Sequence, residues 1–244
     1  MTKQIGFVLV LTLVLLGCET VDSNTIRGND ELYASFEITA NRNGTTNVLA
    51  EIRIGGPISN VSLDLESGDQ LVSYSGSEVE ELARHRDLFG PVQYRGTLGV
   101  NAPGTPVRIA FFRQNDADAP QSTVTLPPFV DVTGPSSGTV FSWGSDDITV
   151  TWSPVGQAGK VDVIFSGRCG TTSFLEHRAI SGDPGRATYE VASLLSEAIR
   201  DAGSDCSVEV AVERTNEGTL DPGFGAGGVI KAMRRDVVSV SFVR

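Results

Sequence analysis

Hydrophobic and polar residues alternate along most of the first half of the chain, which is typical of β-strands with one buried face. Every second residue is apolar in the runs "LYASFEIT" (32–39), "NVLAEIRI" (47–54), "VSLDL" (61–65), "VRIAFF" (107–112) and "STVTL" (122–126). Turn signals such as Asn43-Gly44 and Pro103-Gly104 separate these runs. Short alternating strands with frequent turns predict an antiparallel sandwich.

One segment of this half, "SEVEELARHRDLFGP" (77–91), has a different pattern. Ser77 and Glu80 have the spacing of a helix capping box, and Gly90-Pro91 is a stop signal. These features predict a short helix between strands, with Val79 and Leu82 facing the sheet.

A second β pattern follows the rigid dipeptide Pro127-Pro128, which marks the joint between two units. Its alternating runs are "DITVTWSP" (147–154), "KVDVIFSG" (160–167), "CSVEVAVERT" (206–215) and "DVVSVSFVR" (236–244). The run "RATYEVASLL" (186–195) leads into "SLLSEAIRDAG" (193–203), which predicts a helix that Gly203 would cap. The predicted fold class is therefore all-β, with two tandem antiparallel β-sandwiches over residues 31–128 and 129–244 and one short helix in each.

The second unit carries a resemblance to a known domain class. The runs "ITVTWSP", "YEVASLL" and "CSVEVAVER" look like strands B, E and F of a fibronectin type III or related immunoglobulin-like domain, and the run between the first two resembles strand C. The resemblance covers roughly residues 129–244. It implies an immunoglobulin-like fold for this unit, and we expect the first sandwich to be immunoglobulin-like as well. In an antiparallel pair, the end of the C-like strand near Gly167 and the start of the F-like strand near Cys206 are neighbours.

The N-terminus has the character of an export signal. Lys3 precedes the apolar run Ile5–Leu16, which is too short to cross a bilayer as a helix. The following "LLGC" resembles a bacterial lipobox. This resemblance implies a signal peptide at 1–17 that is removed, and fatty acylation of Cys18, for example with palmitate. Residues 18–30 are polar and without period, so we expect a tether of at most about 40 Å.

The compartment bears on the other two cysteines. An even pair in an exported protein is usually oxidised, so Cys169 and Cys206 are expected to form a disulfide. The residue after Cys18 is Glu19 rather than the Asp that favours inner-membrane retention in well-studied Gram-negative bacteria. We therefore expect the cell envelope, at the outer membrane, as the location.

Net charge limits the partners. The chain has a net charge of −11, and loss of Lys3 with the signal would make it −12. An acidic body argues against nucleic acid as a partner and against electrostatic docking on a membrane, so we expect membrane contact only through the lipid.

Candidate sites for chemistry are few. "GFGAGG" (223–228) has the spacing of a dinucleotide motif but lacks the strand before it and the helix after it. We interpret it as a long loop that could bind a partner, through Gly223, Phe224, Gly225, Gly227 and Gly228. Asn115, Asp116 and Asp118, or Asp146 and Asp147, are candidate calcium ligands. The alternative interpretation is that these residue types form ordinary hairpin turns. No metal ligand and no cofactor are predicted.

The residues also give little support for catalysis. His85 and His177 are the two histidines, and neither lies in a nucleophile motif. We therefore predict a non-enzymatic structural, adhesive or assembly module that binds an envelope protein or a glycan. The alternative is a carbohydrate- or cell-wall-binding module, suggested by Trp143 and the glycine-rich loop. A hydrolase acting on an envelope polymer is the third hypothesis.

Overall fold

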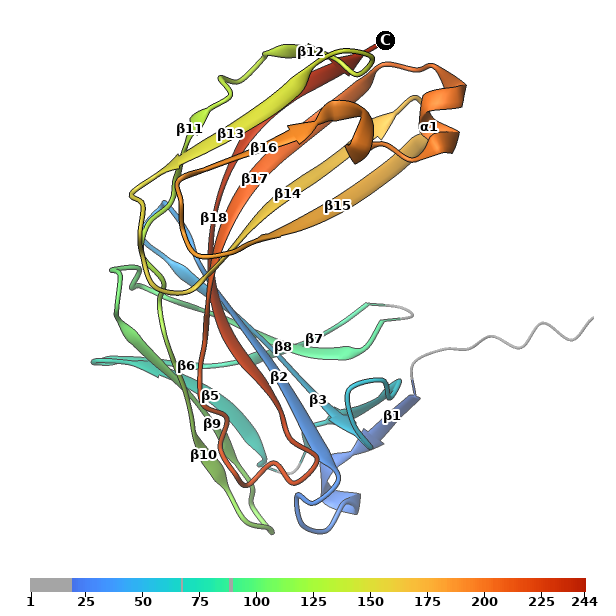
Figure 1. Cartoon of the computed structure of the whole chain (residues 1–244). Helices are drawn as coiled ribbons and strands as arrows, with labels where there is room; N and C mark the ends of the chain where they lie inside the picture. The colour runs from blue at the N-terminus through green and yellow to red at the C-terminus, as the bar shows by residue number, and fades with distance from the viewer. Residues whose placement is uncertain (1–18, 67, 88–89) are drawn as a thin grey trace, which may run out of the picture.

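Two separate clusters of buried apolar side chains organise the chain. The computed structural model describes residues 19–66, 68–87 and 90–244, so the proposed signal peptide and Cys18 lie outside the described residues. Each cluster fills one β-sandwich, and the two sandwiches lie end to end with a narrow joint between them (Figure 1). Before the Pro127-Pro128 dipeptide the buried residues belong to the first core, up to Leu126, and the first member of the second core is Val130.

The first sandwich packs two sheets against each other. One sheet has the strand order β10 (Ala119–Thr125), β9 (Pro106–Phe112), β5 (Gln70–Ser75) and β6 (Glu78–Glu81). The facing layer contains β1 (Glu19–Asp22), β4 (Val61–Asp64), β3 (Thr46–Ile54) and β2 (Leu32–Ala40), with β8 (Val92–Leu98) and β7 (Ala83–Arg86) joined to β3. The predicted inward residues Ala34, Phe36 and Ile38 are fully buried between these layers.

The second sandwich has the three-on-four arrangement of an immunoglobulin-like domain. Its smaller sheet has the order β11 (Asp131–Gly134), β13 (Asp147–Ser153) and β16 (Arg186–Glu190). The larger layer has the order β18 (Gly228–Val243), β17 (Cys206–Glu217), β14 (Lys160–Cys169) and β15 (Thr172–Ile180), and β12 (Val140–Ser142) pairs with β18. The predicted all-β fold class with tandem sandwiches is confirmed.

One strand belongs to both sandwiches. β18 is 16 residues long and pairs with β2 in parallel over Gly228–Met233, and with β17 in antiparallel over Lys231–Phe242. It therefore joins the larger layers of the two sandwiches into a single 11-stranded sheet. Figure 1 shows it as the dark red ribbon that runs through the joint.

The joint itself is held by charged side chains of this strand. Arg234 is buried, lies 3.8 Å from the centre of the Phe129 ring and donates to the carbonyl of Asn101 in the first sandwich. Two residues on, Asp236 lies 3.0 Å from Arg42 of the first sandwich and accepts from the backbone N–H of Val132 at 2.7 Å. These contacts connect both sandwiches and their linker to one strand.

The helix predicted in the second sandwich is present. A 3-10 turn (Val191–Leu194) precedes α1 (Glu197–Ala202). Ser196 caps the start of α1 through the N–H of Ile199, and Gly203 ends it with a φ of 65°.

The helix predicted at 77–91 is wrong. Gly76, with a φ of 59°, and Ser77 form a tight turn that pairs Ser75 with Glu78. β6 therefore pairs with β5 as the edge strand of that sheet. Leu82 is buried at the point where the chain crosses to the other sheet and becomes β7, whereas Val79 is 60% exposed. Pairing with β5 and β8 outweighs the local capping signal.

The segment 223–232, which includes the start of β18, also differs from expectation. Residues 129–244 do not all lie in the second sandwich, because Phe224, Ile230 and Ala232 belong to the first core. Phe224 is only 3% exposed and lies between Phe36 and Phe111, with ring centres 5.7 and 5.9 Å away. The first sandwich is therefore not formed by residues 31–128 alone, because a C-terminal segment packs into its core.

The glycines of this segment allow the close approach. A side chain on Gly225 would collide with the backbone of Asp30, and one on Gly228 would collide with the backbone of Ala34. The motif at 223–228 is therefore a packing segment whose aromatic side chain is not available to a ligand, in contrast to the binding loop that we expected.

We predict that Phe224→Ala lowers the free energy of unfolding by about 3–5 kcal/mol, because the truncation leaves a cavity in the first core. Equilibrium denaturation of residues 19–244 measures the change. Val229→Ala is the control, since Val229 is 45% exposed and should change stability by less than about 0.5 kcal/mol. Equal effects of the two substitutions would contradict the packing role of Phe224.

Candidate binding surface

The outer face of the 11-stranded sheet extends over both sandwiches. β18 alternates between sides, so Ile230, Ala232, Val240 and Phe242 point into the two cores. The outward side chains are Val229, Lys231, Met233, Arg235, Val237, Ser239 and Ser241. This series, which we call the outer stripe, runs without interruption across the joint.

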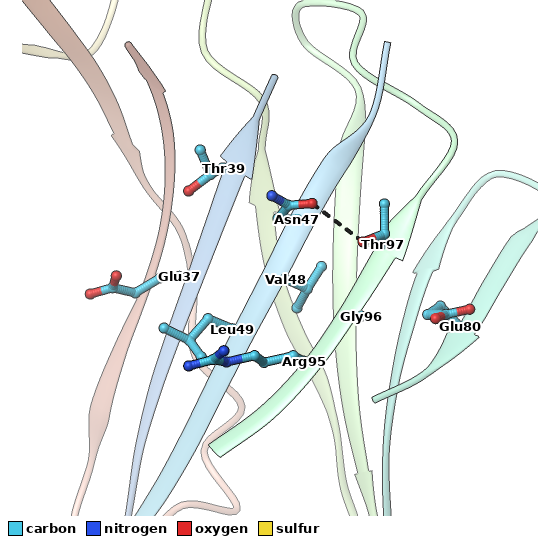
Figure 2. Close-up of a pocket in the computed structure, with 9 residues that line it drawn as sticks. All are labelled: Glu37, Thr39, Asn47, Val48, Leu49, Glu80, Arg95, Gly96 and Thr97. Carbon is cyan, nitrogen blue, oxygen red and sulfur yellow. Dashed lines mark hydrogen bonds between the residues drawn. The ribbon is translucent and has the colours of Figure 1, made fainter. Parts of the chain in front are cut away.

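A groove of about 540 Å³ lies on this face in the first sandwich. Its lining residues, shown in Figure 2, are Glu37, Thr39, Asn47, Val48, Leu49, Glu80, Arg95, Gly96 and Thr97. The registers place Leu49 of β3 directly between Glu37 of β2 and Arg95 of β8. The groove therefore has an apolar centre at Leu49, flanked by the Glu37 carboxylate, which is paired with Lys231, and by the Arg95 guanidinium.

Cross-strand contacts hold the groove's walls in place. Lys231 of the outer stripe lies 2.8 Å from Glu37, and Thr97 donates a 3.3 Å hydrogen bond to Asn47. Arg95 donates to Gln93, which in turn donates to Glu51 at 2.6 Å. The side chains are positioned by a rigid sheet, so a partner would need little ordering of this surface on binding.

The sequence carried one signal for this groove that we did not use. Leu49 occupies an outward position of the alternating run "NVLAEIRI", next to the outward Glu51 and Arg53. An apolar residue on the polar face of a strand is the pattern that could have identified it.

The outer face continues over the second sandwich. His177, Ile164, Ala211 and Val237 are cross-strand neighbours in four adjacent strands. The next row contains Glu213, which has Asp162 on one side and Arg235 on the other. Burial raises the pKa of the Glu213 carboxyl above its ordinary value, although Arg235 and Lys231 act in the opposite direction.

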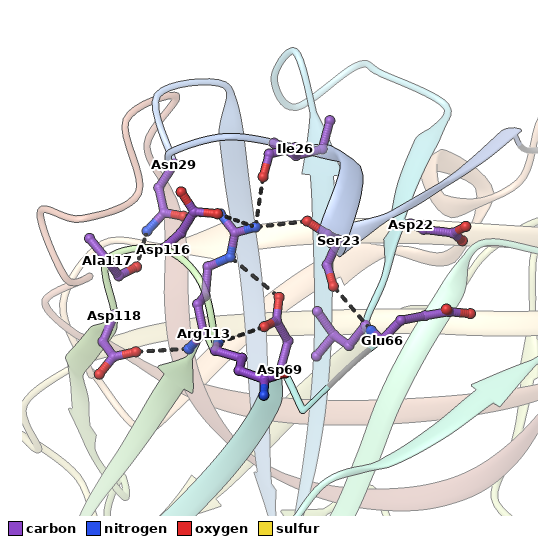
Figure 3. A network of polar contacts seen from close by, with 12 residues as sticks. Asp22, Ser23, Ile26, Asn29, Glu66, Asp69, Arg113, Asp116, Ala117 and Asp118 are labelled. Atoms are coloured by element: carbon purple, nitrogen blue, oxygen red, sulfur yellow. Dashed lines mark hydrogen bonds and ion pairs between the residues drawn. The ribbon is translucent and has the colours of Figure 1, made fainter.

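A second polar network fixes the start of the described chain (Figure 3). Arg113, at the end of β9, is almost fully buried and donates to the carbonyls of Ser23, Ile26 and Gly28 at 2.8–2.9 Å. Its charge is balanced by Asp69 and Asp116, each 3.3 Å away, and it also donates to Asn29 at 2.9 Å. We call this arrangement the N-terminal clamp.

The clamp corrects our expectation for residues 18–30. Glu19–Asp22 forms β1 and pairs in parallel with β4, Ser23–Thr25 forms a 3-10 turn, and the chain to Asn29 binds Arg113. The described residues of the predicted tether are therefore part of the first sandwich. An arginine that continues the inward positions Val107, Ile109 and Phe111 was the signal for a buried ionic network.

The carboxylates considered for calcium have structural partners. Asp116 accepts from the N–H of Gly28 and contacts Arg113, and Asp118 accepts from the N–H of Arg113 at 2.7 Å. Asp146 accepts from the N–H of Ser142 at 2.7 Å. Across residues 19–66, 68–87 and 90–244, no group of three or more His, Cys, Asp or Glu side chains is arranged to hold a metal ion.

The remaining sequence candidates are also placed. Cys169 and Cys206 are cross-strand partners in β14 and β17 and form a disulfide. Trp143 is 7% exposed and packs in the second core, so it presents no stacking face. His85 of β7 lies 3.3 Å from the exposed Asp87, and His177 of β15 is exposed on the other sandwich. The two histidines are therefore on different sandwiches.

Within the described part of the chain, no helix has the length and apolar character needed to cross a bilayer.

Comparison with known proteins gives only distant structural similarities. No family model matches the sequence, and no curated protein matches it. Among solved structures, the chain is similar to the FN1–FN3 domains of chicken CNTN1, with 12% identity over 81% of this chain and 62% of that chain and a TM-score of 0.26. A two-domain fibronectin type III segment of chicken tenascin has 15% identity over 86% of this chain and 98% of its own, with a TM-score of 0.23.

A cytokine receptor complex has 12% identity over 86% of this chain and 95% of its own, with a TM-score of 0.32. Of the CNTN1 chain, the present chain covers 62%, which is less than two thirds of that chain's length. The function proposed below rests on the residues of this chain.

We predict that Arg113→Ala releases the N-terminal clamp, because the buried carbonyls and carboxylates lose their common donor. Trypsin should then cut after the exposed Arg27 in protein that otherwise remains folded, as measured by limited proteolysis and mass spectrometry. Loss of one partner of a buried ion pair costs about 3–5 kcal/mol, which also lowers the unfolding midpoint.

Arg108→Ala is the matched control, since Arg108 lies on the same strand and contacts Tyr74 and Pro120 instead of the N-terminal segment. If the Arg27 site is cut equally fast in both variants, the clamp does not hold this segment.

Proposed function

We propose that this chain is a lipid-anchored protein of the cell envelope that acts as a non-enzymatic binding module for another envelope protein. The lipobox-like "LLGC" before Glu19 supports the anchor, with Cys18 as the acylated residue and the outer membrane as the location. A disulfide between Cys169 and Cys206 is typical of exported proteins and supports the same compartment.

The observation that carries the binding role is the groove around Leu49 on the shared sheet. Leu49 gives it an apolar centre, Glu37 and Arg95 flank this centre, and contacts with Lys231 and Gln93 hold the two charged side chains. A pre-organised surface of this kind suits a protein partner, because complementary charges set the orientation while the apolar centre contributes to affinity.

A protein partner is favoured over a glycan by the position of the aromatic side chains. Sugar rings are commonly bound by stacking on exposed aromatic faces. Trp143 and the glycine-rich loop suggested the carbohydrate alternative, but Trp143 and Phe224, the aromatic residue of that loop, are both buried in cores.

The anchor predicts that metabolic labelling with an alkyne analogue of palmitate marks the wild-type protein. Cys18→Ala should abolish the label and release the protein from the membrane fraction, because a single acylated residue provides the attachment. Equal labelling of the two proteins would contradict lipidation at Cys18.

The binding role predicts a site-specific cross-link in intact cells. A photo-reactive amino acid at Leu49 should give a discrete adduct with another envelope protein, and the same group at Val140, which is 58% exposed in β12 of the second sandwich, should not. Arg95→Glu in the Leu49-labelled protein should remove the adduct, since it reverses the charge of one wall without breaking a buried contact.

The measurement is an immunoblot for mass-shifted product, with thermal unfolding as the check that each variant folds. Identical adducts from the two labelled positions, or an adduct unaffected by Arg95→Glu, would show that the groove is not the binding site.

A further inference from the structure

The described chain begins inside the fold. β1 starts at Glu19, which lies opposite Val61 of β4, and the N-terminal clamp binds the residues that follow. Cys18 directly precedes Glu19 in the sequence, and consecutive Cα atoms are about 3.8 Å apart. An acyl group on Cys18 is therefore linked to the edge of the first sandwich by one residue and not by a long tether.

The turn beside this point carries an unusual side chain. Residues 55–60, "GGPISN", connect β3 to β4 and end next to Val61, the partner of Glu19. Ile58 in this turn is 97% exposed, whereas the next most exposed large apolar residue described, Leu175, is 62% exposed. The turn contains no charged residue, although the chain carries 30 acidic residues.

The turn is also well ordered. The N–H of Gly55 donates to Glu31 at 2.8 Å, and the N–H of Ser59 donates to Gly56 at 3.2 Å. The guanidinium of Arg53 donates to the carbonyl of Pro57 at 2.8 Å. Ile58 is therefore presented on a fixed support, so its insertion into another phase requires little loss of backbone freedom.

A single exposed apolar residue is ordinary on a protein surface. The position of Ile58 indicates what it would contact, because the acyl chains of Cys18 would bring a bilayer to the same edge of the sheet. A neutral turn can approach anionic lipid headgroups without the repulsion that the acidic body would meet.

We propose that the turn at 55–60 is a membrane contact and that Ile58 inserts into the lipid interface beside the Cys18 anchor. The proposal rests on the lipid anchor of the proposed function. Contact at two points would fix the orientation of the first sandwich on the bilayer, which a lipid alone does not do.

The test uses full-length lipidated protein with a cysteine introduced at one position and labelled with the fluorophore NBD. The three native cysteines do not compete, since Cys169 and Cys206 are bridged and Cys18 would carry the lipid. Ile58→Cys is compared with Val79→Cys, an exposed position in β6 on the other sheet of the first sandwich. Both proteins are reconstituted into vesicles of phosphatidylethanolamine and phosphatidylglycerol that contain a doxyl-labelled lipid.

We expect a blue shift and strong quenching of NBD at position 58, and emission at position 79 that is the same with and without vesicles. Protein that floats with the vesicles but shows equal, aqueous emission at the two positions overturns the membrane contact and leaves the anchor intact. Absence of lipid on wild-type protein, seen by mass spectrometry as an unmodified Cys18, overturns the anchor and the contact together. Equal unfolding midpoints of the two variants confirm that labelling has not disturbed the fold.

Discussion

The relation between the two sandwiches depends on a single strand that cannot bend without losing partners on both sides. Over Lys231–Met233, β18 pairs with β2 of the first sandwich and with β17 of the second at the same time. Its inward side chains enter one core, then the joint, then the other core. Rotation of one sandwich against the other would break ladder hydrogen bonds and expose Arg234, so both terms oppose such a rotation.

Three buried arginines extend this constraint to the irregular segments. Arg113, Arg214 and Arg234 each continue the inward positions of an apolar run, where a charge is costly unless it is paired or fully hydrogen-bonded. Arg214 donates to the carbonyls of Phe129 and Pro154 and lies 2.8 Å from Asp183, which also accepts from Trp152 at 2.6 Å. Arg113 and Arg214 combine backbone carbonyls of loops, linker and N-terminal segment with carboxylates. Arg234 donates to one carbonyl and contacts the Phe129 ring, while its Nε and Nη1 have no hydrogen-bond partner within the described residues. In these segments, which have no regular structure, backbone carbonyls accept hydrogen bonds from a buried arginine, as they would from a neighbouring strand in a sheet.

These features separate what local sequence can predict from what it cannot. Period-two alternation identified the inward face of β2, β3, β9, β13, β14 and β17, because burial on one side of a strand is a local pattern. Gly203 and the α1 segment were also predictable, since a cap acts within one turn. The segments at 77–91 and 223–228 were misjudged because their conformation is decided by distant partners, Leu71 and Gly96 for Leu82, and Phe36 and Phe111 for Phe224.

The same distant contacts determine what the groove could do in the envelope. A module on a flexible tether samples many orientations, and its partner must capture one of them at an entropic cost. In this chain, β1 and the clamp attach the N-terminal segment to the first sandwich, and β18 attaches the first sandwich to the second. A lipid on Cys18, together with the proposed membrane contact of Ile58, would therefore transmit one orientation to the whole outer stripe and to the groove at Leu49. The binding surface would then face a direction set by the fold, and affinity for a partner in the same membrane would depend on that direction as much as on the contacts of Glu37 and Arg95.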